Sequence, residues 1–291
     1  MDTSVFLKIS FADALNAWIE SIVVNYGDFL HEVSAFLLQT LLVPIEKFLI
    51  AAPPVAVLAF IGVVAWFGLR RVGLTVAFVA SLYFIGCLGL WEKTMQTLAI
   101  MLVSIILCLI AGLPIGILMA RHRWLSRVLT PVLDVMQTFP MFVYMLPAVM
   151  LFSIGKVPAV IATLIYSLPP LIRLTELGIR QVDAEVREAA TSFGASTWQI
   201  LLWVQLPLAR PSIMAGINQT TMMALAMVVV ASMIGARGLG EDILHGLTNL
   251  DFGKGAHAGV AVVILAIVID RISQSYGLTA RQRAALSKKG G

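Results

Sequence analysis

Charged residues are scarce in this chain, and the few present are confined to short segments. Only 12% of the 291 residues are Asp, Glu, Lys or Arg, whereas soluble domains average about 25%. Seven stretches contain none of them: 51–69, 72–91, 94–120, 135–155, 157–172, 211–236 and 255–269. Because a helix crosses a bilayer with about 20 apolar residues, the sequence predicts an all-α integral membrane protein with about seven transmembrane helices.

Cysteine and histidine are too few and too scattered for a disulfide framework or a metal site. Cys87 and Cys108 both fall inside predicted spans, where a thiol behaves as a small apolar side chain. The four histidines show no ligand spacing. The chain also offers no nucleophile, base and orienting group in one sequence context. We therefore expect this chain to hold no cofactor and no metal, and not to be an enzyme.

The sequence also lacks the usual means of powering transport. It has no G-x-x-x-x-G-K-[ST] phosphate-binding loop, so it cannot bind ATP by that route. Ion-coupled carriers usually place carboxylates at membrane depth, and the apolar stretches contain none. These absences favour a transporter driven by a partner. A self-contained secondary transporter or channel for a small polar solute remains the alternative, since backbone carbonyls at broken helices can hold sodium.

The basic residues that are present predict the orientation of the chain. With the N-terminus outside and the C-terminus inside, fourteen Lys and Arg lie in the inner loops and tail and six lie outside. Such an excess on the cytoplasmic side is typical of inner-membrane proteins. The formal net charge of +4 therefore reflects topology, and it does not indicate nucleic-acid binding. We expect a multi-pass protein of the bacterial inner (plasma) membrane, in contact with lipid.

The charge distribution divides the chain into three parts. Residues 1–50 are expected to form a periplasmic segment, with an interfacial amphipathic helix over 34–50. An eighth span over 34–50 is less favoured, because it would contain a proline and two charges and would reverse the orientation of the N-terminus. Residues 51–275 form the predicted transmembrane domain, and 276–291 a basic cytoplasmic tail.

Prolines and glycines mark the expected ends of several spans. The fourth span should open at Thr130-Pro131, because proline is favoured in the first turn of a helix. The fifth should kink or break at Pro169-Pro170, where two backbone donors are missing. The sixth should begin at Pro211, and residues 235–240 should form a tight outer turn.

A polar island over 173–210 is predicted to form a compact cytoplasmic knob. Asp183 to Ser192 is rich in Ala and Glu and predicts a short helix, and Gly194 suits the left-handed position that ends it. Ser196 and Gln199 have the spacing of a capping box, so a second helix should start there and run to Pro207.

Six residues of this island resemble the EAA loop of the permease subunits of bacterial ABC importers. They are Glu188, Ala189, Ala190, Gly194, Leu206 and Pro207. Val204 stands where the family pattern has Ile, which keeps a β-branched apolar side chain. The resemblance implies that these six residues couple the chain to an ATPase.

Further motifs resemble the permeases of glycine betaine, proline betaine and choline importers. They are Gln137–Pro140, Ile161–Thr163, Leu168–Thr175 and Ile234–Gly240. The resemblance implies a type I ABC importer permease bundle that pairs with a second permease copy and two cytoplasmic ATPase subunits, which carry the ATP and magnesium. It also implies a separate periplasmic solute-binding protein and a quaternary ammonium substrate.

Three aromatic residues are candidates for the translocation path, because aromatic rings attract quaternary ammonium groups by cation–π interaction. They are Phe139, Tyr144 and Tyr166, all within predicted spans. Ordinary packing or anchoring at the membrane interface is the competing interpretation for each.

Overall fold

The computed structural model describes residues 11–277, and this part of the chain is helical with no strand. The helices are α1 (Phe11–Phe36), η1 (Leu37–Leu42), α2 (Val43–Ala51), α3 (Pro54–Leu69), α4 (Val72–Cys87), α5 (Trp91–Arg121), α6 (Arg123–Thr138), α7 (Met141–Phe152), α8 (Lys156–Arg180), α9 (Ala184–Ser192), α10 (Thr197–Gln199), η2 (Ile200–Gln205), α11 (Leu206–Ala231), η3 (Ser232–Ala236), α12 (Leu239–Thr248) and α13 (Phe252–Gly277). The predicted basic tail lies outside the described residues from position 278 onward.

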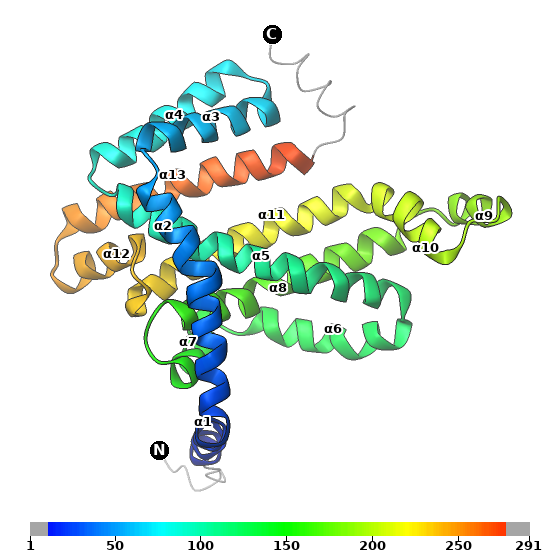
Figure 1. Cartoon of the computed structure of the whole chain (residues 1–291), viewed down its shortest axis with the longest axis horizontal. Helices are drawn as coiled ribbons and strands as arrows, with labels where there is room; N and C mark the ends of the chain where they lie inside the picture. Colours follow the sequence, from blue (N-terminus) through cyan, green and yellow to red (C-terminus); the bar gives the residue numbers. More distant parts are fainter. Residues whose placement is uncertain (1–10, 278–291) are drawn as a thin grey trace, which may run out of the picture.

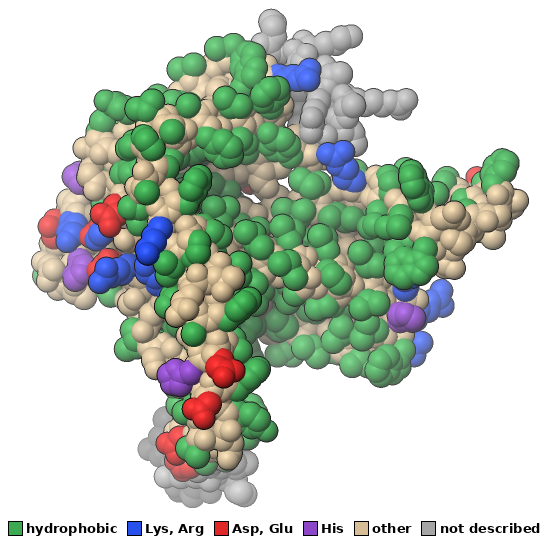
Figure 2. Space-filling model, viewed as in Figure 1, with side chains coloured by type: hydrophobic (Ala, Val, Ile, Leu, Met, Phe, Trp, Pro, Cys, Tyr) green, Lys and Arg blue, Asp and Glu red, His purple; other side chains and the backbone are tan. Residues whose placement is uncertain are grey.

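The long helices run back and forth along one direction, with α9 and α10 at one end of the molecule and α12 at the other (Figure 1). Hydrophobic side chains cover most of the face in Figure 2, and charged side chains gather near α12 and near the ends of the long helices. An apolar flank with charged ends is what a lipid-embedded bundle requires, because exposed charge at membrane depth is costly.

Helix α8 lies at the centre of the bundle and packs against α5 and α11. Glycines allow this close approach. A Cβ atom on Gly116 of α5 would lie 2.7 Å from the Thr175 Cβ and 2.8 Å from the Ile172 carbonyl oxygen of α8. On the other side of α8, a Cβ on Gly216 of α11 would lie 3.1 Å from the Leu174 Cβ. Small residues at such contacts let membrane helices pack backbone to backbone.

Most of the predicted spans correspond to a single helix of the structure. Within residues 11–277, five helices are long and apolar enough to cross a membrane, or six if the bent pair α6 and α7 is one span. Spans three, five, six and seven correspond to α5, α8, α11 and α13. Spans one and two correspond to the shorter apolar helices α3 and α4, with 16 residues each. The predicted all-helical membrane bundle is therefore confirmed, and its number of spans agrees roughly with the predicted seven.

The fourth span is two helices that meet at an angle of 99°. The first, α6, begins at Arg123 and not at Thr130. The chain turns at Phe139, which has the extended backbone angles φ −69° and ψ 135°. Pro140 follows it, and proline disfavours a helical conformation in the preceding residue. The motif that was expected inside one span therefore forms its bend.

Of the kink or break expected at Pro169-Pro170, the break is absent, because α8 continues through both prolines to Arg180, and the kink stays a prediction. Both prolines are buried, and neighbouring helices can stabilise a membrane helix that lacks some of its own backbone hydrogen bonds. The coupling loop is consequently shorter than the predicted 173–210. Its first eight residues belong to α8, and its last five belong to α11.

The N-terminal helix is longer than the sequence indicated. Residues 34–50 are helical as expected, but the helix begins at Phe11 and continues through η1 and α2 to Ala51. By length and composition Asn16–Ala51 would suffice to cross a membrane. In Figure 1, however, this helix runs across α5, α8 and α11 and not alongside them. That arrangement is the one an interfacial helix would have, and its position in a membrane stays a prediction.

The end of the bundle opposite α9 is held by ion pairs. Lys156, at the start of α8, lies 2.5 and 2.6 Å from the two carboxylate oxygens of Glu46 in α2. Lys93 of α5 lies 2.6 Å from Asp242 of α12, a helix that the sequence did not predict. The predicted turn over 235–240 is present, and Gly235 and Gly238 have φ angles of 97° and 126°.

Candidate coupling site and translocation path

The first helix of the predicted knob is α9, and its start is capped by a side chain, which the sequence analysis did not predict. Asp183 precedes the helix, and its Oδ1 accepts a hydrogen bond of 3.0 Å from the backbone N–H of Glu185. Such a cap satisfies one of the backbone donors that have no partner in the first turn. A helix of nine residues can therefore form outside the bundle.

Gly194 ends α9 in the left-handed conformation that was predicted, with φ of 79°. The N–H of Gly194 donates to the Thr191 carbonyl at 2.9 Å, and the N–H of Ala195 donates to the Ala190 carbonyl at 3.1 Å. This pair of bonds is a Schellman motif, which satisfies carbonyls left free at a helix end. The chain thereby reverses within three residues and enters the second helix.

The second helix begins with the predicted capping box. The N–H of Ser196 donates to Gln199 Oε1 at 2.7 Å, and the N–H of Gln199 donates to Ser196 Oγ at 3.4 Å. The prediction that this helix ends at Pro207 was wrong, because α10, η2 and α11 follow one another without a break from Thr197 to Ala231. A π-helical turn, η2, precedes Pro207, and proline is tolerated in the first turn of the α11 segment that follows. The second helix of the knob and the sixth span are thus one continuous helix.

The first helix and the tip of the knob are largely exposed, whereas Leu201 of the second helix is buried. No residue of α9 is buried, and Glu188, Ala189, Gly194 and Pro207 are exposed, while Ala190 and Leu206 are half-buried. At the tip, Phe193 is 92% exposed. The sequence reasoning missed Phe193, although an aromatic residue inside a polar island was a signal that could have found it. A capped helix with an exposed aromatic tip is suited to bind another protein.

Near the base of the knob, Arg121 joins α5 to the knob and Arg180 joins α8 to α5. Arg121, the last residue of α5, donates from Nη2 to the Thr197 carbonyl at 3.2 Å, and its guanidinium lies 4.4 Å from the centroid of the Trp198 ring. Arg180, the last residue of α8, donates to the Met119 carbonyl at 2.8 Å. Sequence reasoning treated both only as topological charges.

The structure brings together the three aromatic residues predicted for the translocation path. The ring centroid of Tyr144 lies 6.2 Å from that of Phe139 and 5.9 Å from that of Tyr166. The hydroxyl of Tyr144 also donates to the Met136 carbonyl. In an unbroken helix that carbonyl would accept from residue 140, which is a proline without an N–H. Tyr144 therefore stabilises the bend between α6 and α7.

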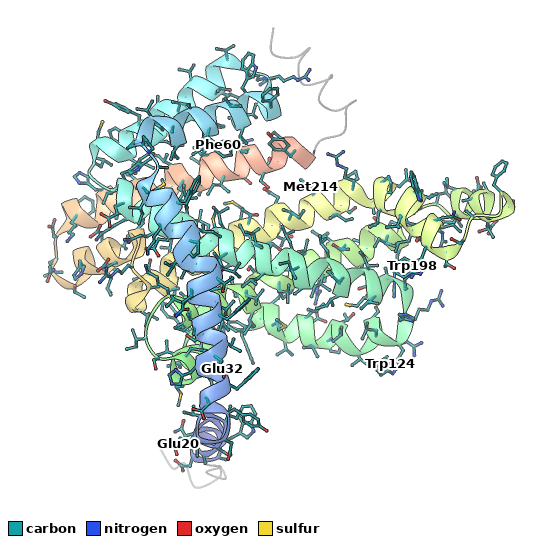
Figure 3. The ribbon with its side chains drawn as sticks, viewed as in Figure 1. Glu20, Glu32, Phe60, Trp124, Trp198 and Met214 are labelled. Atoms are coloured by element: carbon teal, nitrogen blue, oxygen red, sulfur yellow. The ribbon has the colours of Figure 1, made fainter. Side chains whose placement is uncertain are left out.

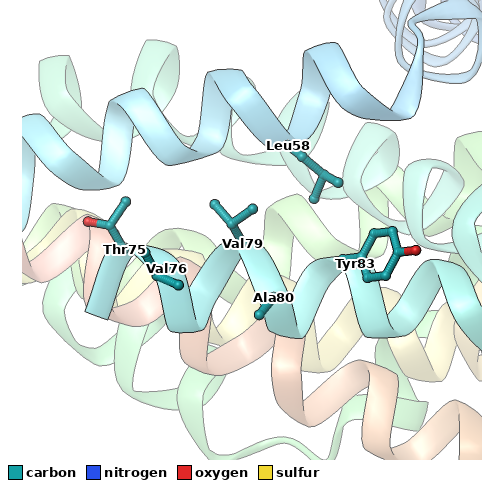
Figure 4. Close-up of a pocket in the computed structure, with 6 residues that line it drawn as sticks. All are labelled: Leu58, Thr75, Val76, Val79, Ala80 and Tyr83. Atoms are coloured by element: carbon teal, nitrogen blue, oxygen red, sulfur yellow. The ribbon is translucent and has the colours of Figure 1, made fainter. Parts of the chain in front are cut away.

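An apolar groove between α3 and α4 is a poor candidate for a substrate site (Figure 4). It encloses about 350 Å³ and is lined by Leu58, Thr75, Val76, Val79, Ala80 and Tyr83. The Thr75 hydroxyl already donates to the Arg71 carbonyl at 3.0 Å. A binding site needs several polar groups that converge on the ligand, and this groove lacks them. Across residues 11–277, no three His, Cys, Asp or Glu lie close enough to hold a metal ion.

Comparison with known proteins decides the family. Residues 112–276, which include α8, the knob and α11, match the family described as binding-protein-dependent transport system inner membrane component. This chain is a member of that family. As a permease of this family it is a transport protein of the inner membrane that crosses the bilayer several times, as the sequence predicted.

Two curated relatives resemble this chain over most of its length. The permease is 50% identical over 239 residues to the glycine betaine/proline betaine transport system permease protein ProW of Escherichia coli, covering 82% of this chain and 67% of that protein. It is 41% identical over 276 residues to the glycine betaine transport system permease protein OpuAB of Bacillus subtilis, covering 95% and 97%.

The fold also has a structural counterpart. An inward-facing structure of the MetNI methionine ABC transporter superimposes on the permease with a TM-score of 0.56, at 23% identity, over 66% of this chain and 93% of that one. This likeness confirms the predicted fold of an ABC importer permease.

Proposed function

We propose that this permease is the membrane-spanning subunit of an ATP-driven importer for quaternary ammonium osmolytes such as glycine betaine, proline betaine or choline. The observation that carries the proposal is the knob, an exposed and capped helix pair joined without a break to a membrane helix. The substrate class is supported by the two relatives, whose names specify glycine betaine or proline betaine.

The knob would dock in a groove of a separate ATPase subunit through Glu188, Ala189, Ala190, Gly194, Leu206 and Pro207. Movement of the ATPase would then move the continuous helix from Thr197 to Ala231, which is roughly 50 Å long at 1.5 Å per residue. Arg121 would pass the same movement to α5 through its bond to Thr197, and Arg180 would pass it from α5 to α8 through its bond to Met119. Rigid-body motion of packed helices is a common way to switch access.

The complete transporter would contain a second permease copy, two ATPase subunits that bind ATP and magnesium, and a separate periplasmic binding protein. The binding protein would meet the end of the bundle around α12, which lies opposite the knob (Figure 1). The substrate would pass the bend between α6 and α7, where Phe139, Tyr144 and Tyr166 lie in contact. Phe139 is 48% exposed, so its ring is available to a cation through cation–π attraction.

Reconstitution would test this proposal. The permease, its ATPase and its binding protein are placed in liposomes, and uptake of radiolabelled glycine betaine is measured with and without internal ATP. The proposal predicts uptake that requires ATP and both partners. Uptake by the permease alone, driven by an ion gradient, would instead establish the alternative of a secondary transporter or channel.

A further inference from the structure

A pocket of about 280 Å³ lies at the base of the knob, and its walls are strongly basic. Arg121 ends α5, Arg123 begins α6 and Arg180 ends α8, while Arg187 comes from α9 and Gln205 from η2. Four guanidinium groups from four helices therefore surround one space. The substrate path that we propose does not use this pocket.

The positive charge of the pocket is only partly balanced. Arg180 lies 3.1 Å from Glu176 of its own helix, and Arg121 is engaged by Thr197 and Trp198. The side chains of Arg123 and Arg187 make no hydrogen bond or ion pair within residues 11–277, although the backbone of Arg187 is bonded within α9. Guanidinium groups bind phosphate oxygens with paired hydrogen bonds, so the pocket has the chemistry of a phosphate site.

Exposed tryptophans beside the pocket indicate that a lipid headgroup is the source of the phosphate. Trp124 is 70% exposed and follows Arg123 directly, and Trp198 is 63% exposed beneath Arg121. Both lie at the end of the bundle that carries the knob (Figure 3). Tryptophan is enriched at the level of lipid headgroups. The pocket also lies where α5 and α8 end, and the basic inner end of a membrane helix is expected at the level of the lipid headgroups.

We propose that this arginine pocket binds the phosphate of an anionic phospholipid headgroup in the inner leaflet. A phosphate held there would join α5, α6, α8 and α9, and so would fix the base of the knob against the bundle. Basic pockets between membrane helices on the cytoplasmic side suit such headgroups. The proposal does not depend on which solute is transported.

The test measures the melting temperature of the purified permease in neutral detergent while phosphatidylglycerol or phosphatidylcholine is added. The variant Arg123→Gln/Arg187→Gln removes the two arginines without partners. The matched control is Arg127→Gln/Arg210→Gln, which removes equal charge from two exposed inner arginines that do not line the pocket. We expect phosphatidylglycerol to stabilise the wild type and the control. Each arginine near the membrane surface contributes about 1 kcal/mol, and about 1.4 kcal/mol corresponds to a tenfold change in affinity. The apparent affinity of phosphatidylglycerol for the pocket variant should therefore fall about 30-fold.

Three results would overturn the proposal. The first is equal stabilisation of the pocket variant and the wild type by phosphatidylglycerol. The second is equal stabilisation of the wild type by inorganic phosphate, which would show a site for a free anion. The third is an unchanged lipid response together with loss of ATPase binding, which would show that the arginines contact the ATPase. Single variants at positions 123 and 187 keep the test decisive if the double variant does not fold.

Discussion

The turn at Gly194 offers the sharpest test of the knob as an ATPase dock. Its φ of 79° is in the left-handed region, and a Cβ atom there would meet nothing within 4 Å. Substitution would therefore cost backbone strain without a clash, about 1–2 kcal/mol for a residue other than glycine. For Gly194→Val the strain should be at the upper end of this range, because the valine side chain is β-branched. A strain of this size lowers the equilibrium constant for the native turn roughly 5- to 30-fold, and affinity for the ATPase should fall by up to the same factor.

The assay is binding of the purified ATPase to the permease in nanodiscs, followed by ATP-driven uptake. Gly89→Val is a matched control, because Gly89 has φ of 73° and open space around it but lies between α4 and α5 at the opposite end. Gly194→Asn should keep near-normal affinity, since asparagine tolerates the left-handed region. The reasoning is refuted if Gly194→Val binds the ATPase as tightly as the wild type, or if Gly89→Val weakens binding equally.

Three further predictions concern the bundle. Tyr144→Phe removes the hydroxyl that bonds the free carbonyl at the α6–α7 bend, and thermal unfolding should show a loss of about 1–3 kcal/mol; an unchanged melting temperature would contradict that role. Lys156→Met leaves the buried carboxylate of Glu46 unpaired and should cost about 3–5 kcal/mol, most of it recovered when both residues become Met. Gly116→Val should force α5 from α8 and cost about 1–3 kcal/mol, whereas Gly73→Val, with nothing within 4 Å, should fold normally.

Local signals in the sequence predicted the knob well. Each depends on hydrogen bonds between residues close in the chain, as in the Gly194 turn and the capping box of Ser196 and Gln199. Such bonds form wherever the segment lies, so the sequence contains all the information needed. The six coupling residues were placed on the knob for the same reason, and their role in binding an ATPase stays a prediction.

Features that depend on neighbouring helices were not predictable in this way. Proline lowers helix stability in isolation, yet α8 continues through Pro169 and Pro170 because α5 and α11 enclose it, whereas at Pro140 the chain bends. The sequence alone does not distinguish these two outcomes. Nor does it show that Arg121 and Trp198, 77 positions apart in the printed sequence, form a cation–π pair.

Thiol labelling from each side of the membrane tests the central claim most directly, with Cys87 and Cys108 replaced by Ala. Phe193 and Leu250 are each 92% exposed, one at the knob and one between α12 and α13. With an impermeant maleimide, Leu250→Cys should react in intact cells. Phe193→Cys should react only in inside-out vesicles, and bound ATPase should protect it. Labelling of Phe193→Cys from outside, or an equal rate with and without the ATPase, would contradict a cytoplasmic knob that docks the ATPase.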